Sequence, residues 1–285
     1  MPNNSLPLST RVLIVGLGLM GGSYARALTA KGYRVTAITK DEADVTYALE
    51  NGIVAEATTA VEPRLIAEAD LVVFALYPHI LTNWITEHQH LFSPHTIITD
   101  VTGVKTSVVS AVQETLRPDV EFIASHPMAG RELSGVRNST AAIFSNANYI
   151  VTPTAQNTPH AIALCESLGH TLGFARVSRL TPEEHDNAIA FLSQLTHCIA
   201  VALMTCNDTA GLEAYTGDSF RDLTRIARIN DEMWSELFLL NKEHLLSHMD
   251  KFAAEFQALR RFIAEDDQEA LRAMMRLSTE RRDRF

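Results

Sequence analysis

The chain has 285 residues, 46% hydrophobic and 20% charged, which is typical of a globular protein of about two domains with a sizeable core. A formal net charge of −10 argues against nucleic acid as a partner, because phosphate backbones bind to basic surfaces. The three cysteines form no CxxC pair, so neither a metal site nor a disulfide framework is expected, and a reducing cytoplasm is favoured.

The first expected element is an apolar strand at 11–15, which runs directly into the glycine-rich segment 16–22 and then into a helix-compatible stretch. Dinucleotide binding requires this order. The first glycine permits a sharp turn, the second lets a pyrophosphate approach, and the third lets the helix pack closely with its amides toward the phosphates. The residues assigned to the cofactor here are Gly16, Leu17, Gly18, Leu19, Met20 and Gly21.

Short apolar runs then alternate with helix-like segments as far as about residue 152. The expected strands are 11–15, 34–38, 71–76, 96–100, 121–124 and 148–152, with another near 174–178. This alternation predicts an α/β fold with a doubly wound, mostly parallel, Rossmann-type sheet. Ligands bind at the carboxyl ends of such strands, so further cofactor contacts are expected at strand ends. They are Thr39, Lys40, Ala75, Leu76, Thr102 and Gly103.

The end of the second strand bears on the choice of cofactor. Enzymes that prefer NAD place an acidic residue there to hold both ribose hydroxyls. Here Thr39 stands at that place and Lys40 follows, a pair that could accept a 2′-phosphate, while Asp41 also lies within the usual window. The sequence therefore predicts NADP or NAD, with a slight preference for NADP.

From residue 181 onward the pattern becomes helical. Thr181 is followed by a proline and two glutamates, which together signal a capped helix start, and no proline occurs between 183 and 285. We expect a dinucleotide-binding domain at 1–180 and an all-helical domain at 181–285. The first helix is apolar on most of its circumference, which predicts burial on all sides and a homodimer of interlocking helices. Gln194 and His197 within this run argue against a membrane span.

His126 is the first candidate for catalysis. It lies in Ser-His-Pro-Met-Ala-Gly at 125–130, just after the expected strand 121–124, and therefore faces the ligand crevice. An imidazole there can accept a proton while a hydride leaves for a nicotinamide, since its ordinary pKa suits that task. A loop histidine that only caps the strand is the alternative.

Five motifs in the same order resemble those of the prephenate dehydrogenase family over nearly the full chain. They are VGLGLMGGS at 15–23, SHPMAG at 125–130, TPEEHD at 181–186, LSQLTH at 192–197, and FRDLTRIA with MW at 220–227 and 233–234. The resemblance implies oxidative decarboxylation of prephenate to 4-hydroxyphenylpyruvate in tyrosine biosynthesis. It also implies that His126 hydrogen-bonds the ring hydroxyl of the substrate.

The resemblance assigns further substrate contacts in the helical half. Arg225 matches the arginine that binds a substrate carboxylate, and His197 matches a second histidine of the pocket. Glu132 and Asp222 match acidic residues that form an ionic gate with the arginine. From the residues alone, Arg225 could be a solvated helix charge, although it shares a helix face with Asp222. His197 could equally be a core histidine. His185, twelve residues earlier, is expected to be structural and to lie outside the site.

Two positions depart from the family pattern. Gly103 stands where family members often have a serine, so Thr102, one residue earlier, becomes the candidate for the missing hydroxyl. Arg131 replaces a small hydroxyl residue. It is expected to contact a substrate carboxylate or to pair with a local acid.

Three alternatives remain open. A β-hydroxyacid dehydrogenase has a similar nucleotide loop, but it needs a catalytic lysine for which Lys242 is a weak candidate. Arogenate dehydrogenase performs the same chemistry on a substrate with an amino group. A redox sensor would hold the nucleotide without turnover, and the presence of His126 and Arg225 argues against it.

Overall fold

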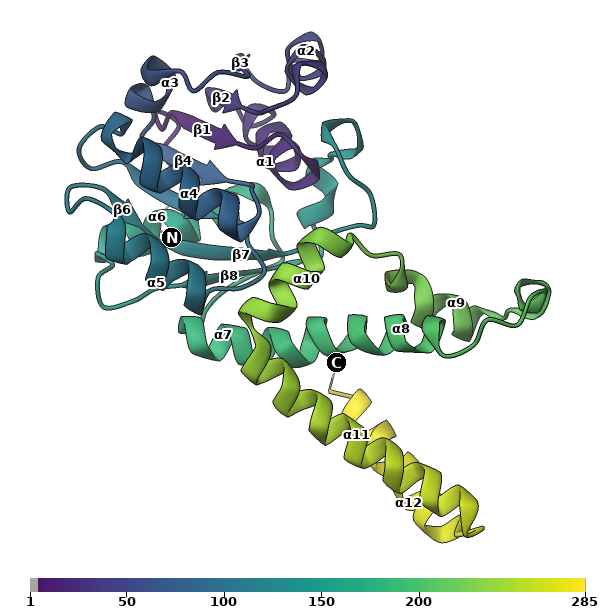
Figure 1. Ribbon diagram of the computed structural model, residues 1–285. Coiled ribbons are helices and arrows are strands. Elements are labelled where there is room, and N and C mark those ends of the chain that lie inside the picture. The colour runs from purple at the N-terminus through teal and green to yellow at the C-terminus, as the bar shows by residue number, and fades with distance from the viewer. Residues whose placement is uncertain (1–4, 285) are drawn as a thin grey trace.

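In the computed structural model, which describes residues 5–284, a parallel sheet with flanking helices is followed by an extended helical region (Figure 1). The six sheet strands run in the order β3-β2-β1-β4-β5-β6, and every neighbouring pair is parallel. They are β1 (Val12–Val15), β2 (Val35–Ile38), β3 (Glu56–Thr58), β4 (Leu71–Phe74), β5 (Ile97–Asp100) and β6 (Glu121–Phe122). This is the doubly wound order of dinucleotide-binding domains, so the expected fold class is confirmed.

Helices cover both faces of the sheet and bury its apolar strands. The helices of this half are α1 (Leu19–Thr29), α2 (Glu42–Glu50), α3 (Pro63–Glu68), α4 (Pro78–His88), α5 (Thr106–Thr115) and α6 (Pro159–Leu172). Buried residues of α1 and α6 pack on one side of the sheet, and those of α4 and α5 pack on the other. All four residues of β1, β2, β4 and β5 are buried, which explains why these strands read as continuous apolar runs.

The strands after residue 122 do not join the main sheet, contrary to expectation. β7 (Ala124–Met128), β8 (Asn148–Thr152) and β9 (Arg176–Arg179) form a separate three-stranded sheet. β8 runs antiparallel to β7 and parallel to β9. The expected strand 121–124 is therefore two strands, β6 and β7, which belong to different sheets. Apolar alternation identifies a strand but not its partner.

The helical half begins with one continuous helix at Pro182–Thr205. It comprises α7 (Pro182–Ile189), a π-helical segment (Ala190–Leu195) and α8 (Thr196–Thr205). The predicted capping box is present, since Thr181 and Glu184 bond each other's backbone. The helices that follow are α9 (Asp218–Thr224), α10 (Asp231–Leu240), α11 (Lys242–Ala264) and α12 (Gln268–Arg282). α11 and α12 form a hairpin that extends away from the sheet (Figure 1).

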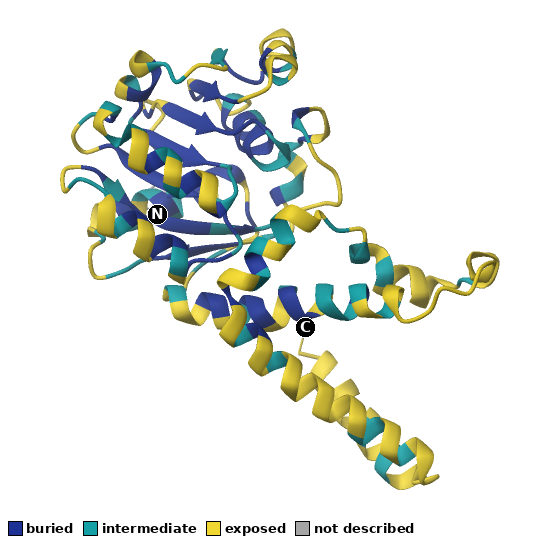
Figure 2. Ribbon diagram, viewed as in Figure 1, coloured by how far each residue is buried: buried dark blue, intermediate teal, exposed yellow. Residues whose placement is uncertain are grey.

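The single chain does not bury the first long helix on all sides, and the expected burial by a second copy stays a prediction. Only 28% of its most apolar window is buried, and Phe191, Leu192 and Met204 are exposed. Figure 2 shows buried residues concentrated in the sheet region and mostly exposed ones along the α11–α12 hairpin. By length and composition alone, Pro182–Thr205 would suffice to cross a membrane. Within one chain, too few helices pack around it to cover its apolar surface.

Candidate active site

The glycine loop has the geometry that its sequence predicts. Gly16 has φ of +100°, and a Cβ there would lie 2.5 Å from the carbonyl oxygen of Ala75. A Cβ on Gly21 would lie 1.8 Å from the carbonyl oxygen of Gly16, so only glycine permits this packing. A Cβ on Gly18 would meet nothing within 4 Å, and no side chain caps the start of α1 there. The open approach to free helix amides fits a pyrophosphate.

Other residues assigned to the cofactor surround this loop. Leu76 follows β4, and its Cδ2 would lie 2.9 Å from a Cβ on Gly16, so Ala75 and Leu76 are brought against the loop. Leu17 is buried and can offer a cofactor only its backbone. Leu19 and Met20 form the first turn of α1 and are partly exposed.

The end of β2 is less informative about the ribose. Thr39 is buried, and its backbone N–H donates to Thr58 at 3.1 Å, while Lys40 is exposed. The Asp41 carboxylate caps α2 by accepting from the Ala43 N–H at 2.8 Å. The acid nearest the expected ribose position is therefore engaged in a helix cap.

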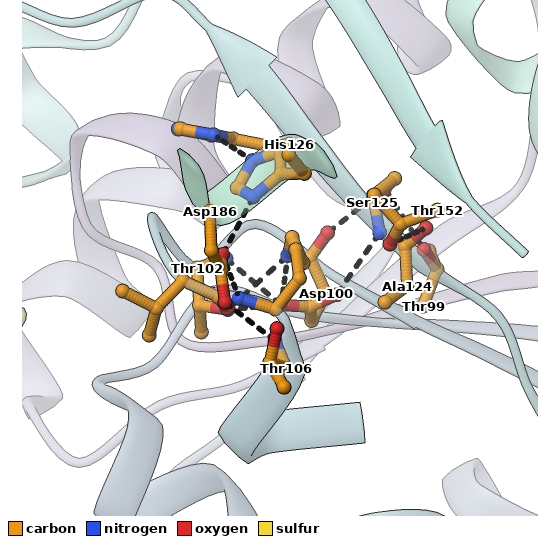
Figure 3. Close-up of polar contacts among 12 residues, drawn as sticks. Thr99, Asp100, Thr102, Thr106, Ala124, Ser125, His126, Thr152 and Asp186 are labelled. Carbon is orange, nitrogen blue, oxygen red and sulfur yellow. Dashed lines mark hydrogen bonds and ion pairs between the residues drawn. The ribbon is translucent and has the colours of Figure 1, made fainter. Parts of the chain in front are cut away.

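His126 lies at one end of a line of three hydrogen-bonded side chains (Figure 3). It belongs to β7 and not to a loop, because that strand continues to Met128. Its Nδ1 lies 2.8 Å from Nε2 of His185, and Nδ1 of His185 lies 2.8 Å from Oδ1 of Asp186. We call these three residues the His–His–Asp line. His185, which the sequence placed outside the site, contacts the candidate base directly.

The π-helical segment invalidates the helical-wheel comparison that placed His185 outside the site. Its position relative to His197 was judged on a regular α-helix, but the residues between them include Ala190–Leu195, which is π-helical. Bonding between residues five apart changes the rotation per residue, so a regular helical wheel misplaces everything beyond it. Sequence periodicity carries no signal for such a segment.

Burial favours the neutral form of His126. Burial lowers the pKa of His126 well below 6.5, and the nearby ionisable groups of His185 and Lys105 lower it further. The pKa of His185 is also lowered by burial, against the raising effect of its hydrogen bond with Asp186. A neutral imidazole at neutral pH can accept a proton.

A fully buried ion pair, Lys105 with Asp100, lies next to the His–His–Asp line. Nζ of Lys105 lies 2.6 Å from Oδ2 of Asp100 and 3.2 Å from Oγ1 of Thr102. The Thr102 hydroxyl donates to Asp100 and lies 2.9 Å from the carbonyl oxygen of Val104. Thr102 therefore directs its hydroxyl into this buried cluster. Gly103 lies beside His126, since a Cβ there would be 4.0 Å from its Cε1.

The residues expected to hold a substrate carboxylate form a second cluster. Arg225 makes an ion pair with Glu132, and their side chains are 63% and 31% exposed. His197 stacks on Trp234 with ring centroids 3.7 Å apart, and its Nδ1 lies 2.9 Å from the carbonyl oxygen of Ser193. Burial lowers the pKa of His197; Glu132 raises it and Arg225 lowers it, so all three groups lie within electrostatic range of one another.

Two expected substrate residues are not brought into these clusters. Asp222 on α9 and Arg131 after β7 are exposed, and within residues 5–284 neither side chain makes a hydrogen bond or ion pair. Arg225 pairs with Glu132 of the nucleotide half in preference to Asp222, three residues before it. The face shared by Asp222 and Arg225 ends where α9 tightens into a 3₁₀ turn at Arg225.

Helix α10 joins the two clusters. Its Trp234 stacks on His197, and its Leu237 lies 3.3 Å from the position of a Cβ on Gly103, beside His126. The Leu237 carbonyl accepts from Nε2 of the buried Gln194 at 3.1 Å. Helix α10 therefore lies between His126, which could accept a proton, and the cluster of Arg225 and His197, which could bind a carboxylate.

Curated relatives resemble the chain over most of its length. A prephenate dehydrogenase of Bacillus subtilis is 29% identical over 282 residues, which cover 95% of this chain and 75% of the relative. A cyclohexadienyl dehydrogenase of Zymomonas mobilis is 31% identical over 266 residues, which cover 90% and 89% of the two chains.

A solved structure gives the same picture and bears on the cofactor. The chain is similar to prephenate dehydrogenase from A. aeolicus in complex with hydroxyphenyl propionate and NAD+, with a TM-score of 0.87, 27% identity, and coverage of 97% of this chain and 98% of that one. The slight preference for NADP expected from Thr39 and Lys40 is not supported, because this similar structure contains NAD+. The character of two residues at one strand end is a weak guide to the ribose contact.

Two family models match consecutive parts of the chain. The prephenate dehydrogenase nucleotide-binding domain matches residues 24–178, and the prephenate dehydrogenase dimerisation domain matches residues 181–277. The first match covers the Rossmann-type sheet from β2 onward, with β1 and the glycine loop lying before it, and the second covers most of the helical half. The chain therefore belongs to the prephenate dehydrogenase family.

Proposed function

We propose that this protein oxidatively decarboxylates prephenate to 4-hydroxyphenylpyruvate. The ring C4 carbon gives up a hydride and its hydroxyl gives up a proton, which makes a dienone. The ring carboxylate then leaves as carbon dioxide, the electrons of the broken bond make the ring aromatic, and the phenolate oxygen takes a proton back. A bound nicotinamide dinucleotide supplies the hydride acceptor. The observation that carries the proposal is a neutral His126 on β7, within the half of the chain that bears the nucleotide loop.

His126 is proposed to accept the hydroxyl proton. Its Nδ1 is engaged with His185, so Nε2 is the nitrogen available to the substrate. Proton acceptance by a positioned imidazole typically contributes two to four orders of magnitude to the rate, roughly 10²–10⁴-fold. Gly103 lies next to the ring, and a Cβ there would lie 3.3 Å from Cδ1 of Leu237, so a larger residue would press on Leu237.

Arg225 is proposed to bind a carboxylate of the substrate. Its guanidinium is paired with Glu132 and remains 63% exposed, so an incoming carboxylate can compete for it. Glu132 is proposed to act as an ionic gate, with Asp222, three residues before Arg225, as a second acid. His197, whose Nδ1 is engaged by Ser193 and whose ring stacks on Trp234, is proposed to bind the substrate through its remaining ring nitrogen. Arg131 and Thr102 are kept as substrate-binding candidates.

We further propose NAD as the preferred cofactor, bound along the glycine loop and the ends of β2, β4 and β5. The open space at Gly18 and the free amides of α1 fit its pyrophosphate. The chain is proposed to divide into a nucleotide domain at 1–180 and a helical domain at 181–285. Two copies would pair through the exposed apolar surface of the helical domain, in the cytoplasm.

Arogenate is the second candidate substrate. The chain is also similar to Synechocystis arogenate dehydrogenase, with a TM-score of 0.82, 25% identity, and coverage of 96% and 99% of the two chains. Prephenate and arogenate differ only in the side chain beyond the reacting ring, so a single polar contact decides between them. The β-hydroxyacid dehydrogenase alternative is not supported, because both matching family models belong to prephenate dehydrogenase.

The test is cofactor reduction by the purified protein, followed by near-ultraviolet absorbance. Prephenate, arogenate and a 3-hydroxyacid are each supplied with NAD+ and then with NADP+. We expect turnover with prephenate and NAD+, and its loss in His126→Asn with the NAD+ affinity retained. No turnover with any substrate would reject the proposal in favour of a nucleotide sensor. Faster turnover with arogenate would reassign the substrate.

A further inference from the structure

We infer that His185 and Asp186 are positioning residues that hold His126 in one tautomer, with its proton on Nδ1 and its lone pair on Nε2. The inference rests on the proposed role of His126 as proton acceptor and adds the groups that prepare it. Neither residue needs to touch the substrate. Both act through the His–His–Asp line.

The direction of each hydrogen bond follows from the ionised carboxylate at the end of the line. Asp186 accepts from the backbone N–H groups of Lys105 and Thr106, both at 2.8 Å, and from His185. Burial raises the pKa of Asp186, but the hydrogen bonds from His185 and Thr106 outweigh burial, so the pKa lies below its ordinary value. An ionised carboxylate can only accept, so Nδ1 of His185 carries a hydrogen.

The remaining nitrogens are then determined. A neutral imidazole protonated on Nδ1 has its lone pair on Nε2, so Nε2 of His185 can only accept. Its partner 2.8 Å away, Nδ1 of His126, must therefore donate. The lone pair of His126 is left on Nε2. When that nitrogen takes up a proton, the positive charge forms at the far end of a line that ends in the carboxylate of Asp186.

The line is rigid because the two positioning residues are inaccessible to water. His185 is fully buried and Asp186 is 2% exposed. Both lie in α7, whose first turn is fixed by the capping box of Thr181 and Glu184. The Asp186 carbonyl also accepts from Nδ2 of the buried Asn241 at 2.8 Å. A side chain whose neighbours are held in this way presents one geometry to the reacting group.

The line also connects the two halves of the chain. His126 belongs to the nucleotide half and His185 and Asp186 to the helical half, yet Asp186 accepts from the backbone at the start of α5 in the nucleotide half. The tautomer of the base is therefore correct only while α7 is docked on α5. The docking of α7 on α5 therefore sets the tautomer of His126 and also brings the substrate contacts of the helical half to the site.

The first experiment measures the tautomer without turnover. Nitrogen-15 labelled histidine reports on each ring nitrogen by NMR, and His126→Asn identifies the His126 signals. We expect the wild-type protein to show His126 protonated on Nδ1 at neutral pH. A His126 protonated on Nε2 would overturn the inference, even if prephenate is the substrate. Conversely, failure of the proposed reaction would leave this measurement intact.

The second experiment compares two variants of similar polarity. His185→Gln offers an amide oxygen that can accept from Nδ1 of His126, whereas the shorter His185→Asn cannot reach it. We expect His185→Asn to lower kcat by between about 10-fold and 10⁴-fold with a nearly unchanged KM, as for other orienting groups. His185→Gln should recover a large part of that loss and keep the Nδ1 proton.

Matched controls separate positioning from folding. His170→Gln changes an exposed histidine on α6 and should leave kcat and the tautomer unchanged. NAD+ affinity and the thermal midpoint of each variant are measured in parallel. Equal kcat in wild type, His185→Gln and His185→Asn would overturn the inference. So would equal losses in both variants with the wild-type tautomer retained, since that would indicate only a packing role.

Discussion

Replacement of Lys105 by methionine tests whether the buried ion pair beneath the site stabilises the fold. Lys105 and Asp100 are both fully buried, with Nζ 2.6 Å from Oδ2. Methionine keeps most of the apolar stem and removes the ammonium. The Asp100 carboxylate then retains the backbone N–H of Thr102 at 3.0 Å, that of Ser125 at 3.1 Å, and the Thr102 hydroxyl.

The expected cost follows from leaving a buried charge without its counter-ion. Breaking a buried pair by removing one partner costs about 3–5 kcal/mol. Three hydrogen-bond donors still face the Asp100 carboxylate, so we expect a value near the lower end, about 3 kcal/mol. Unfolding a chain of this length carries an entropy of about 0.6 kcal/mol/K, so the thermal midpoint should fall by about 5 °C.

The assay is thermal unfolding of Lys105→Met, Asp100→Asn and the double variant, followed by circular dichroism. The double variant removes both charges and leaves neither one unpaired. We therefore expect its loss of unfolding free energy to be smaller than the sum of the two single losses by about 1–3 kcal/mol. A Lys105→Met protein that melts within about 1 °C of wild type would refute the reasoning. Strict additivity in the double variant would refute it as well.

Three further predictions concern the site itself. Burial, with the nearby groups of His185 and Lys105, lowers the pKa of His126, so kcat/KM should be retained as pH falls to 6.5 and lost only below it. An acid limb above 6.5 in the pH–rate profile would contradict this. Gly18→Ala should keep the wild-type thermal midpoint but lower the NAD+ affinity measured by calorimetry. Gly21→Ala should lower the thermal midpoint, because its Cβ would lie 1.8 Å from a carbonyl oxygen. A lower midpoint in Gly18→Ala with an unchanged midpoint in Gly21→Ala would disprove the loop assignment. Arg225→Ala should raise KM by about 10-fold to 100-fold with little change in stability, because its ion pair is largely exposed, and an unchanged KM would remove it from substrate binding.

Local patterns in the sequence determined the fold class and the main motifs. The strand at the start, the three glycines and the capped helix at Thr181 each depend on residues adjacent in the chain, so their conformations can be inferred from residue type. The strand at Glu56–Thr58 was missed because it is a short edge strand with no apolar run. The family motifs identified His126, Arg225 and His197 as candidates before any geometry was known.

Only the tertiary structure decided which residues surround those candidates. His185 lies 59 positions from His126, and Lys105 lies 81 positions from Asp186, yet both pairs are in hydrogen-bond contact. Such contacts depend on how α7 docks on β7 and α5. Strand pairing is likewise non-local, which is why Asn148–Thr152 was recognised as a strand but assigned to the wrong sheet. The type of a residue determines which hydrogen bonds and charges its side chain can form. Which partner it contacts depends on packing between segments far apart in the chain.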